Sequence, residues 1–108
     1  MTTLQATLRD APDARPDFVG HIYGPMNAVT PPANPPPLFA ALASDDPLFG
    51  DTDYGLAQVW RKARAPIEMH VFEKGDHGFG MTKKGTTSDL WIDEFIAWMR
   101  ARGLLNKS

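Results

Sequence analysis

Residues 38–43 are apolar without interruption, and this run constrains the fold of the chain more than any other feature. A strand with one wet face alternates apolar and polar residues, whereas a strand covered on both faces is apolar throughout. Five of the seven residues at positions 31–37 are prolines. Because proline lacks the N–H that helices and inner strands require, these positions predict a loop. The sequence therefore predicts a buried parallel strand that follows a proline-rich connection inside one domain.

Two other segments predict neighbouring strands. Residues 18–23 form a short apolar run bounded by Pro16 and Gly24. Residues 67–72 alternate, with the apolar side chains of every second residue on one face, as expected of a strand.

Apolar residues at helical spacing predict helices over 53–65, which Pro66 ends, and over 88–102. Thr87 or Ser88 is expected to cap the start of the second helix, and Gly103 to end it. A short helix is also expected over 3–9. Strand, helix, strand, helix in succession implies right-handed parallel crossovers, so the fold class is α/β with about three parallel strands.

Composition limits the functions that the chain can have. With 108 residues, 11 basic and 13 acidic side chains and a net charge of -2, it is one small domain without the basic surface of a nucleic-acid-binding protein. The absence of cysteine excludes disulfides and thiolate zinc sites. No apolar run approaches the roughly 20 residues of a membrane span, and the N-terminus lacks a secretory-signal pattern. We expect a cytoplasmic protein with neither a membrane nor a nucleic-acid partner.

Acidic residues and a histidine follow two of the predicted strands. Asp45 and Asp46 come after residues 38–43, and His77 lies among glycines after residues 67–72. Because the carboxyl ends of parallel strands meet at one edge of a sheet, we expect an acid and the imidazole to meet there. A carboxylate that accepts from Nδ1 fixes the tautomer, so that Nε2 can remove a proton from a nucleophile. Either Asp45 or Asp46 can be this acid.

Other candidate side chains are weaker. His21 and His70 lie within predicted strands and are expected to be structural, so the sequence predicts no metal site. Ser44 is near the acid but would point alongside it, which makes it a poor nucleophile. The glycines at positions 75–80 neither fit the dinucleotide-binding pattern nor open a helix.

Two segments, 36–48 and 68–80, resemble the C-terminal part of α/β-hydrolase esterases, in particular the acetyl-xylan-esterase and dienelactone-hydrolase-like branch. The resemblance covers nearly the whole chain, from residues 15–18 to the helix around residues 91–98. It implies that Asp46, which precedes a proline, is the acid of a catalytic triad and that His77 is its base, with no cofactor.

The chain departs from that family in three ways, one of which is the absence of an HGGG-type oxyanion segment. Asp76 stands where many relatives have glycine. The nucleophile elbow G-x-S-x-G is absent, because the serines are only Ser44, Ser88 and Ser108. The resemblance therefore implies that residues 1–108 are the C-terminal portion of a hydrolase domain, without the half that holds the nucleophile. On this interpretation the chain supplies the Asp–His part of a serine esterase for small esters such as acetylated carbohydrates. The alternative is a truncated, catalytically silent module that associates with itself.

The missing half also bears on assembly. In the family, the strand corresponding to residues 18–23 has a neighbour on its far side. Without that neighbour, the strand presents open N–H and C=O groups. We expect either a homo-oligomer that pairs its sheets or an N-terminal polypeptide that completes the domain, rather than a monomer.

Overall fold

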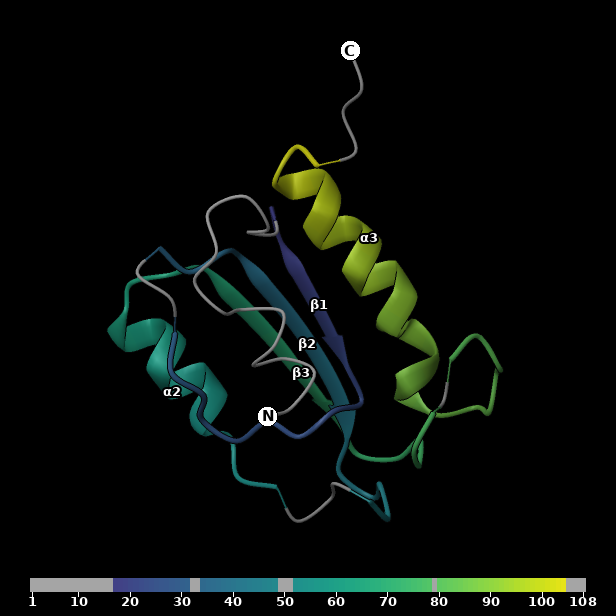
Figure 1. Cartoon of the computed structure of the whole chain (residues 1–108). Coiled ribbons are helices and arrows are strands. Elements are labelled where there is room, and N and C mark those ends of the chain that lie inside the picture. Colours follow the sequence, from purple (N-terminus) through teal and green to yellow (C-terminus); the bar gives the residue numbers. More distant parts are fainter. Residues whose placement is uncertain (1–16, 32–33, 49–51, 79, 105–108) are drawn as a thin grey trace.

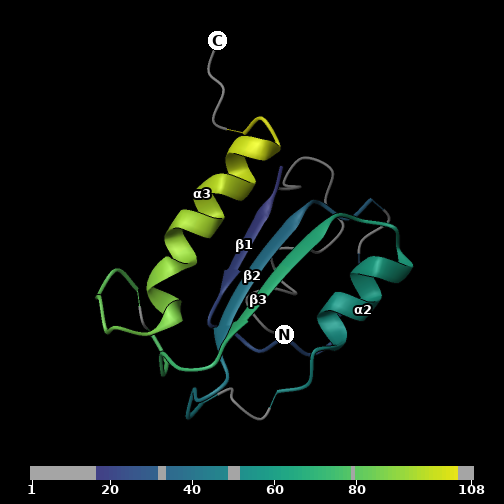
Figure 2. The ribbon, with the colours of Figure 1, turned by 180° about the vertical axis from the view of Figure 1, so that it is seen from behind.

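The computed structural model describes residues 17–31, 34–48, 52–78 and 80–104. In this part of the chain a three-stranded parallel sheet lies between two helices (Figures 1 and 2). Its strands are β1 (Val19–Ile22), β2 (Leu38–Ala43) and β3 (Ile67–Phe72), in the order β1-β2-β3. The α/β class and the three parallel strands are confirmed. The bounds of β2 and β3 match the predicted ones, whereas β1 is shorter than 18–23 by one residue at each end. The helix expected over 3–9 lies outside the described residues.

Strand β2 joins the two halves of the core. All six of its residues are fully buried, as its continuous apolar sequence predicts. Its odd and even positions point to opposite faces of the sheet. Leu38, Ala40 and Leu42 pack with residues of helix α2 (Gly55–Lys62), and the three residues between and after them pack with helix α3 (Trp91–Ala101). The small alanine side chains at three of these positions let both helices lie close to the sheet.

Helix α2 is shorter than the predicted 53–65 at both ends. It buries Leu56 and Trp60 against the sheet, and the Trp60 indole N–H donates to the carbonyl of Pro36 over 3.0 Å. The helix ends before Pro66 because Arg64 adopts a left-handed conformation with φ of 59°. The N–H groups of Arg64 and Ala65 then donate back to the carbonyls of Arg61 and Trp60, which is a Schellman motif. Glycine usually occupies this position.

Helix α3 begins later than predicted because a 3-10 turn, η2 (Thr87–Leu90), precedes it. The expected capping by Thr87 or Ser88 is wrong, since neither η2 nor α3 has a side-chain cap. The carboxylate of Asp89 instead accepts from the backbone N–H groups of Lys84 and Gly85, both at 2.9 Å. The Lys84 hydrogen bond above all lowers the pKa of Asp89, although some desolvation opposes it.

The end of α3 follows the sequence prediction. Gly103 has φ of 76°. Its N–H donates to the carbonyl of Arg100, and that of Leu104 donates to Met99, so this helix also ends in a Schellman motif. Upstream, the Phe95 and Trp98 rings of α3 pack over Phe39, with centroids 4.9 and 5.7 Å away. Neither α2 nor α3, nor any other helix within the described ranges, has the length and apolar character that a membrane crossing requires.

Strand β1 is an outer strand of the sheet as the structure describes it. The N–H groups of Val19 and Tyr23 donate to carbonyls of Pro37 and Ala41. Alternation along a parallel ladder directs the N–H groups of Gly20 and Ile22 to the opposite side, away from β2. This geometry is compatible with the predicted association along β1, but that association stays a prediction.

Candidate active site

The three strands end at one edge of the sheet (Figure 1), and hydrogen bonds join the loops that follow β2 and β3 there. The Ser44 hydroxyl donates to the carbonyl of Glu73 over 3.0 Å, and the Asp76 N–H donates to Asp45 Oδ1 over 2.8 Å. The third bond is between Asp46 Oδ2 and His77 Nδ1, which lie 2.9 Å apart. The structure therefore brings together the acid and the imidazole that the sequence places at this edge.

The carboxylate of Asp46 is enclosed and fixed. Its side chain has no exposed surface, and its second oxygen, Oδ1, accepts from the Leu48 N–H over 2.7 Å. The Asp46 N–H donates to the carbonyl of Ala43, 3.1 Å away, at the end of β2. A buried carboxylate needs partners of this kind, because burial without them is costly. Of the two acids proposed from the sequence, Asp46 contacts the imidazole, and Asp45 binds the backbone beside it.

The loop around His77 has a conformation that few residues adopt. Gly75, Asp76 and Gly78 have φ values of 156°, 56° and 70°. A Cβ on Gly75 would lie 2.6 Å from the Ser88 hydroxyl oxygen, so this position requires glycine for both reasons. The loop leaves the His77 side chain 35% exposed. Its Nδ1 faces the buried acid, which makes Nε2 the nitrogen that can exchange a proton with another group.

The structure shows how aspartate fits at position 76, where many members of the family that the sequence resembles have glycine. Its left-handed φ is the conformation for which glycine has no steric penalty, and aspartate is among the few other residues that tolerate it. Its side chain is exposed and its N–H is held by Asp45. The residue therefore fits the loop in spite of being a second acid next to the histidine.

Sequence analysis did not identify Tyr23 as a neighbour of the pair. This residue follows β1 with φ of 39°, and its ring lies edge-to-face against the His77 imidazole with centroids 5.3 Å apart. Tyr23 also lies at the carboxyl end of a strand, so the rule on strand ends could have predicted its place near His77. Its ring restricts the positions available to the imidazole.

The remaining candidate side chains have hydrogen-bond partners other than this pair. The Ser44 hydroxyl is bound to Glu73, and that of Ser88 lies 2.6 Å from the Thr86 hydroxyl. His21 Nε2 lies 2.7 Å from the carbonyl of Pro25. Burial lowers the pKa of His21, and this hydrogen bond partly opposes the effect. Neither described serine therefore presents its hydroxyl to His77.

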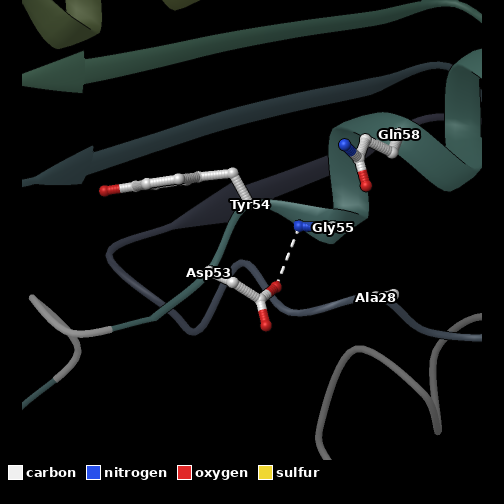
Figure 3. A pocket seen from close by; sticks show the side chains of 5 residues that line it. All are labelled: Ala28, Asp53, Tyr54, Gly55 and Gln58. Atoms are coloured by element: carbon white, nitrogen blue, oxygen red, sulfur yellow. Dashed lines mark hydrogen bonds between the residues drawn. The ribbon is translucent and has the colours of Figure 1, made fainter.

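A shallow open pocket lies at the start of α2, away from the acid–histidine pair. Ala28, Asp53, Tyr54, Gly55 and Gln58 line it (Figure 3). The Asp53 carboxylate accepts from the Gly55 N–H over 2.9 Å and from the Asn27 amide over 2.8 Å. These bonds hold the entry to α2, so the acid in this pocket has a structural use.

Comparisons with known proteins agree with this architecture. No protein-family model and no curated protein matches the chain. Two hydrolases are among the solved structures that are similar to it. One is an acetyl ester-xyloside bifunctional hydrolase from Caldicellulosiruptor lactoaceticus, with a TM-score of 0.72 and 20% identity over 91% of this chain and 48% of that one. The other is MGS-M1, an α/β hydrolase from a Medee basin deep-sea metagenome library, with a TM-score of 0.69 and 21% identity over 91% and 49%.

The chain thus spans about half the length of these two hydrolases. At such low identity the likeness establishes the fold. This fold is that of part of an α/β hydrolase, and it is consistent with the C-terminal part, as the resemblance in the sequence implies.

Proposed function

We propose that the chain supplies the acid and the base of a serine-type carboxylic-ester hydrolase, with Asp46 as the acid and His77 as the base. One observation carries the proposal. A carboxylate without exposed surface lies 2.9 Å from the Nδ1 of a partly exposed imidazole, where two adjacent parallel strands end. Ligands of open α/β sheets bind at this edge.

In the proposed reaction, Asp46 accepts the Nδ1–H and keeps the lone pair of His77 on Nε2. Nε2 takes the proton of a serine hydroxyl as its oxygen bonds to the ester carbonyl carbon. The resulting imidazolium, stabilised by Asp46, gives that proton to the leaving alcohol, and an acyl-enzyme remains. Water then attacks the acyl carbon with the same histidine as base. The bond from the serine oxygen to the acyl carbon breaks, the histidine returns the proton to the serine oxygen, and the carboxylic acid product leaves.

The nucleophile in this proposal comes from a polypeptide segment outside the present sequence. The hydroxyls of Ser44 and Ser88 are bound elsewhere, and the sequence has no G-x-S-x-G segment. Residues 1–108 would accordingly be the C-terminal portion of a hydrolase domain, and the other portion would contribute the serine and the oxyanion hole.

Small esters, including acetylated carbohydrates, are the proposed substrates. The resemblance of residues 36–48 and 68–80 to acetyl-xylan-esterase-like enzymes supports this class, as does the fold shared with a protein described as an acetyl ester-xyloside hydrolase. The second candidate function is a catalytically silent module. It is favoured by the absence from the sequence of a nucleophile motif beside the pair.

Hydrolysis of p-nitrophenyl acetate tests the proposal. The chain is assayed alone and together with the polypeptide encoded upstream of residue 1, and each assay is repeated with His77→Ala. The proposal expects turnover that His77→Ala abolishes. Asp45→Asn is the matched control, because it keeps the oxygen that accepts from Asp76 and should retain turnover. Absence of turnover in both preparations, or turnover indifferent to His77→Ala, would favour the silent module.

A further inference from the structure

Three potential metal ligands from two elements meet on the sheet face that α3 covers. Glu68 and His70 are two residues apart on β3 and so point to the same face, and Glu94 extends from α3. One ligand atom from each of these residues lies within 4.8 Å of the others. The strand and the helix thus present one imidazole nitrogen and two carboxylates to a common point.

The imidazole of this group is held in place by its surroundings. The His70 ring stacks on Phe72 at 9° with centroids 6.0 Å apart, and it lies against Phe39 at 5.3 Å. Its Nε2 is 2.7 Å from Glu68 Oε2. The nitrogen is therefore already directed toward the carboxylates before any ion binds.

The charges of the group are poorly balanced. Within the described ranges, no lysine or arginine nitrogen lies within 4.0 Å of the Glu68 or Glu94 carboxylate. Two carboxylates so close together repel each other, and a cation between them would remove that repulsion. The side chains of His70 and Glu68 are 26% and 43% exposed, so an ion can reach them from solvent.

We propose that Glu68, His70 and Glu94 bind a divalent transition-metal ion of the Zn²⁺ type. One imidazole and two carboxylates suit such ions, whereas Mg²⁺ prefers oxygen ligands alone. Three protein ligands leave further coordination positions to water. The ion would connect β3 to α3 and stabilise the packing of that helix on the sheet. This site is separate from the proposed esterase function.

Titration of the full chain with ZnCl₂, monitored by calorimetry and by thermal unfolding, tests the site. The unfolding midpoint should rise by on the order of 10 °C when free Zn²⁺ is about 100-fold above its dissociation constant. MgCl₂ at the same concentration should leave the midpoint unchanged. Glu94→Gln and His70→Gln should each weaken Zn²⁺ binding at least about tenfold.

Two matched variants make the test specific. Asp93→Asn alters an exposed acid next to Glu94 and should retain Zn²⁺ binding. His77→Gln removes the other paired imidazole and should retain it too. The proposal is overturned if the unaltered chain binds no Zn²⁺, if binding survives both Glu94→Gln and His70→Gln, or if His77→Gln abolishes it. Because Glu94→Gln keeps the shape of a partly exposed side chain, it remains informative even if His70→Gln unfolds the chain.

Discussion

Two histidine–carboxylate pairs in this chain have similar nitrogen–oxygen distances but different surroundings. The atoms of His77 and Asp46 lie 2.9 Å apart, and those of His70 and Glu68 lie 2.7 Å apart. Asp46 is fully enclosed and its second oxygen is bound to the backbone, whereas the Glu68 side chain is 43% exposed. The distance between the atoms therefore does not distinguish the two pairs, but the burial of the carboxylate does.

The two pairs also differ in which imidazole nitrogen bonds to the carboxylate. Asp46 bonds to Nδ1 of its histidine, which leaves Nε2, at the far end of the ring, for proton transfer. Glu68 bonds to Nε2 in the middle of a strand, under a helix. The first arrangement suits chemistry at a sheet edge, and the second suits a ligand held between two elements.

The largest effect is expected from substitutions that break the Asp46–His77 pair. In the assembled esterase that we propose, His77→Ala or Asp46→Asn should lower kcat/KM by about 10³–10⁴-fold, because the base is lost or held in the wrong tautomer. Hydrolysis of p-nitrophenyl acetate measures this effect. Asp45→Asn should change the rate by less than about twofold, and an equal loss in that variant would contradict the assignment of Asp46.

The next largest expected effect is a difference in folding stability between variants of Asp46 and of Glu68. Asp46→Ala removes a buried carboxylate with two partners and should lower the free energy of unfolding by about 2–3 kcal/mol. Glu68→Ala removes a partly exposed one and should change it by less than about 1 kcal/mol. Urea denaturation of both variants gives the comparison. Equal losses would show that burial does not distinguish the pairs.

Within the loop of the first pair, Gly75 should be more sensitive to substitution than Gly78. Gly75→Ala would place a Cβ 2.6 Å from the Ser88 oxygen at φ of 156°, and should destabilise the chain by about 2 kcal/mol. Gly78→Ala meets nothing within 4 Å at φ of 70°, and should cost about 1 kcal/mol. Thermal unfolding tests this order, and the reverse order would refute the close approach at Gly75.

The smallest expected effect concerns His21, which pairs with a carbonyl instead of a carboxylate. Since burial lowers its pKa below the usual 6.5, the unfolded chain binds a proton more readily than the folded one does. Its contribution to stability is therefore complete above pH 6.5 and is lost as the pH falls through the lowered value. The difference in unfolding free energy between pH 5 and pH 8 should be smaller in His21→Gln. A larger difference in that variant would contradict the sign.

The sequence predicted those elements whose residues share one strong pattern. The bounds of β2 and β3 were correct because a continuous or alternating apolar run with proline before it has clear ends. The contact between His77 and an acid after β2 followed from the rule on strand ends, and the resemblance to the hydrolase family selected Asp46 over Asp45. The predicted start of α3 was wrong, because a 3-10 turn precedes the helix and neither element has a side-chain cap.

The parts of the site that were missed depend on spatial packing. Tyr23 reaches His77 only through a left-handed backbone conformation that its own identity does not favour. Glu94 approaches His70 because α3 crosses the sheet at one particular place, and no local pattern encodes that crossing. His70 was expected to be structural because it lies within an alternating strand, a pattern that does not show which helix covers the residue.

The bonds between the loops after β2 and β3 are all internal to this chain. Under the proposed function, the orienting acid and the base arrive as one prearranged unit, and a complementing fragment has to deliver only a hydroxyl and donors for the oxyanion. The molecule would then behave as one half of a split enzyme, in which restored turnover reports that the two fragments have met.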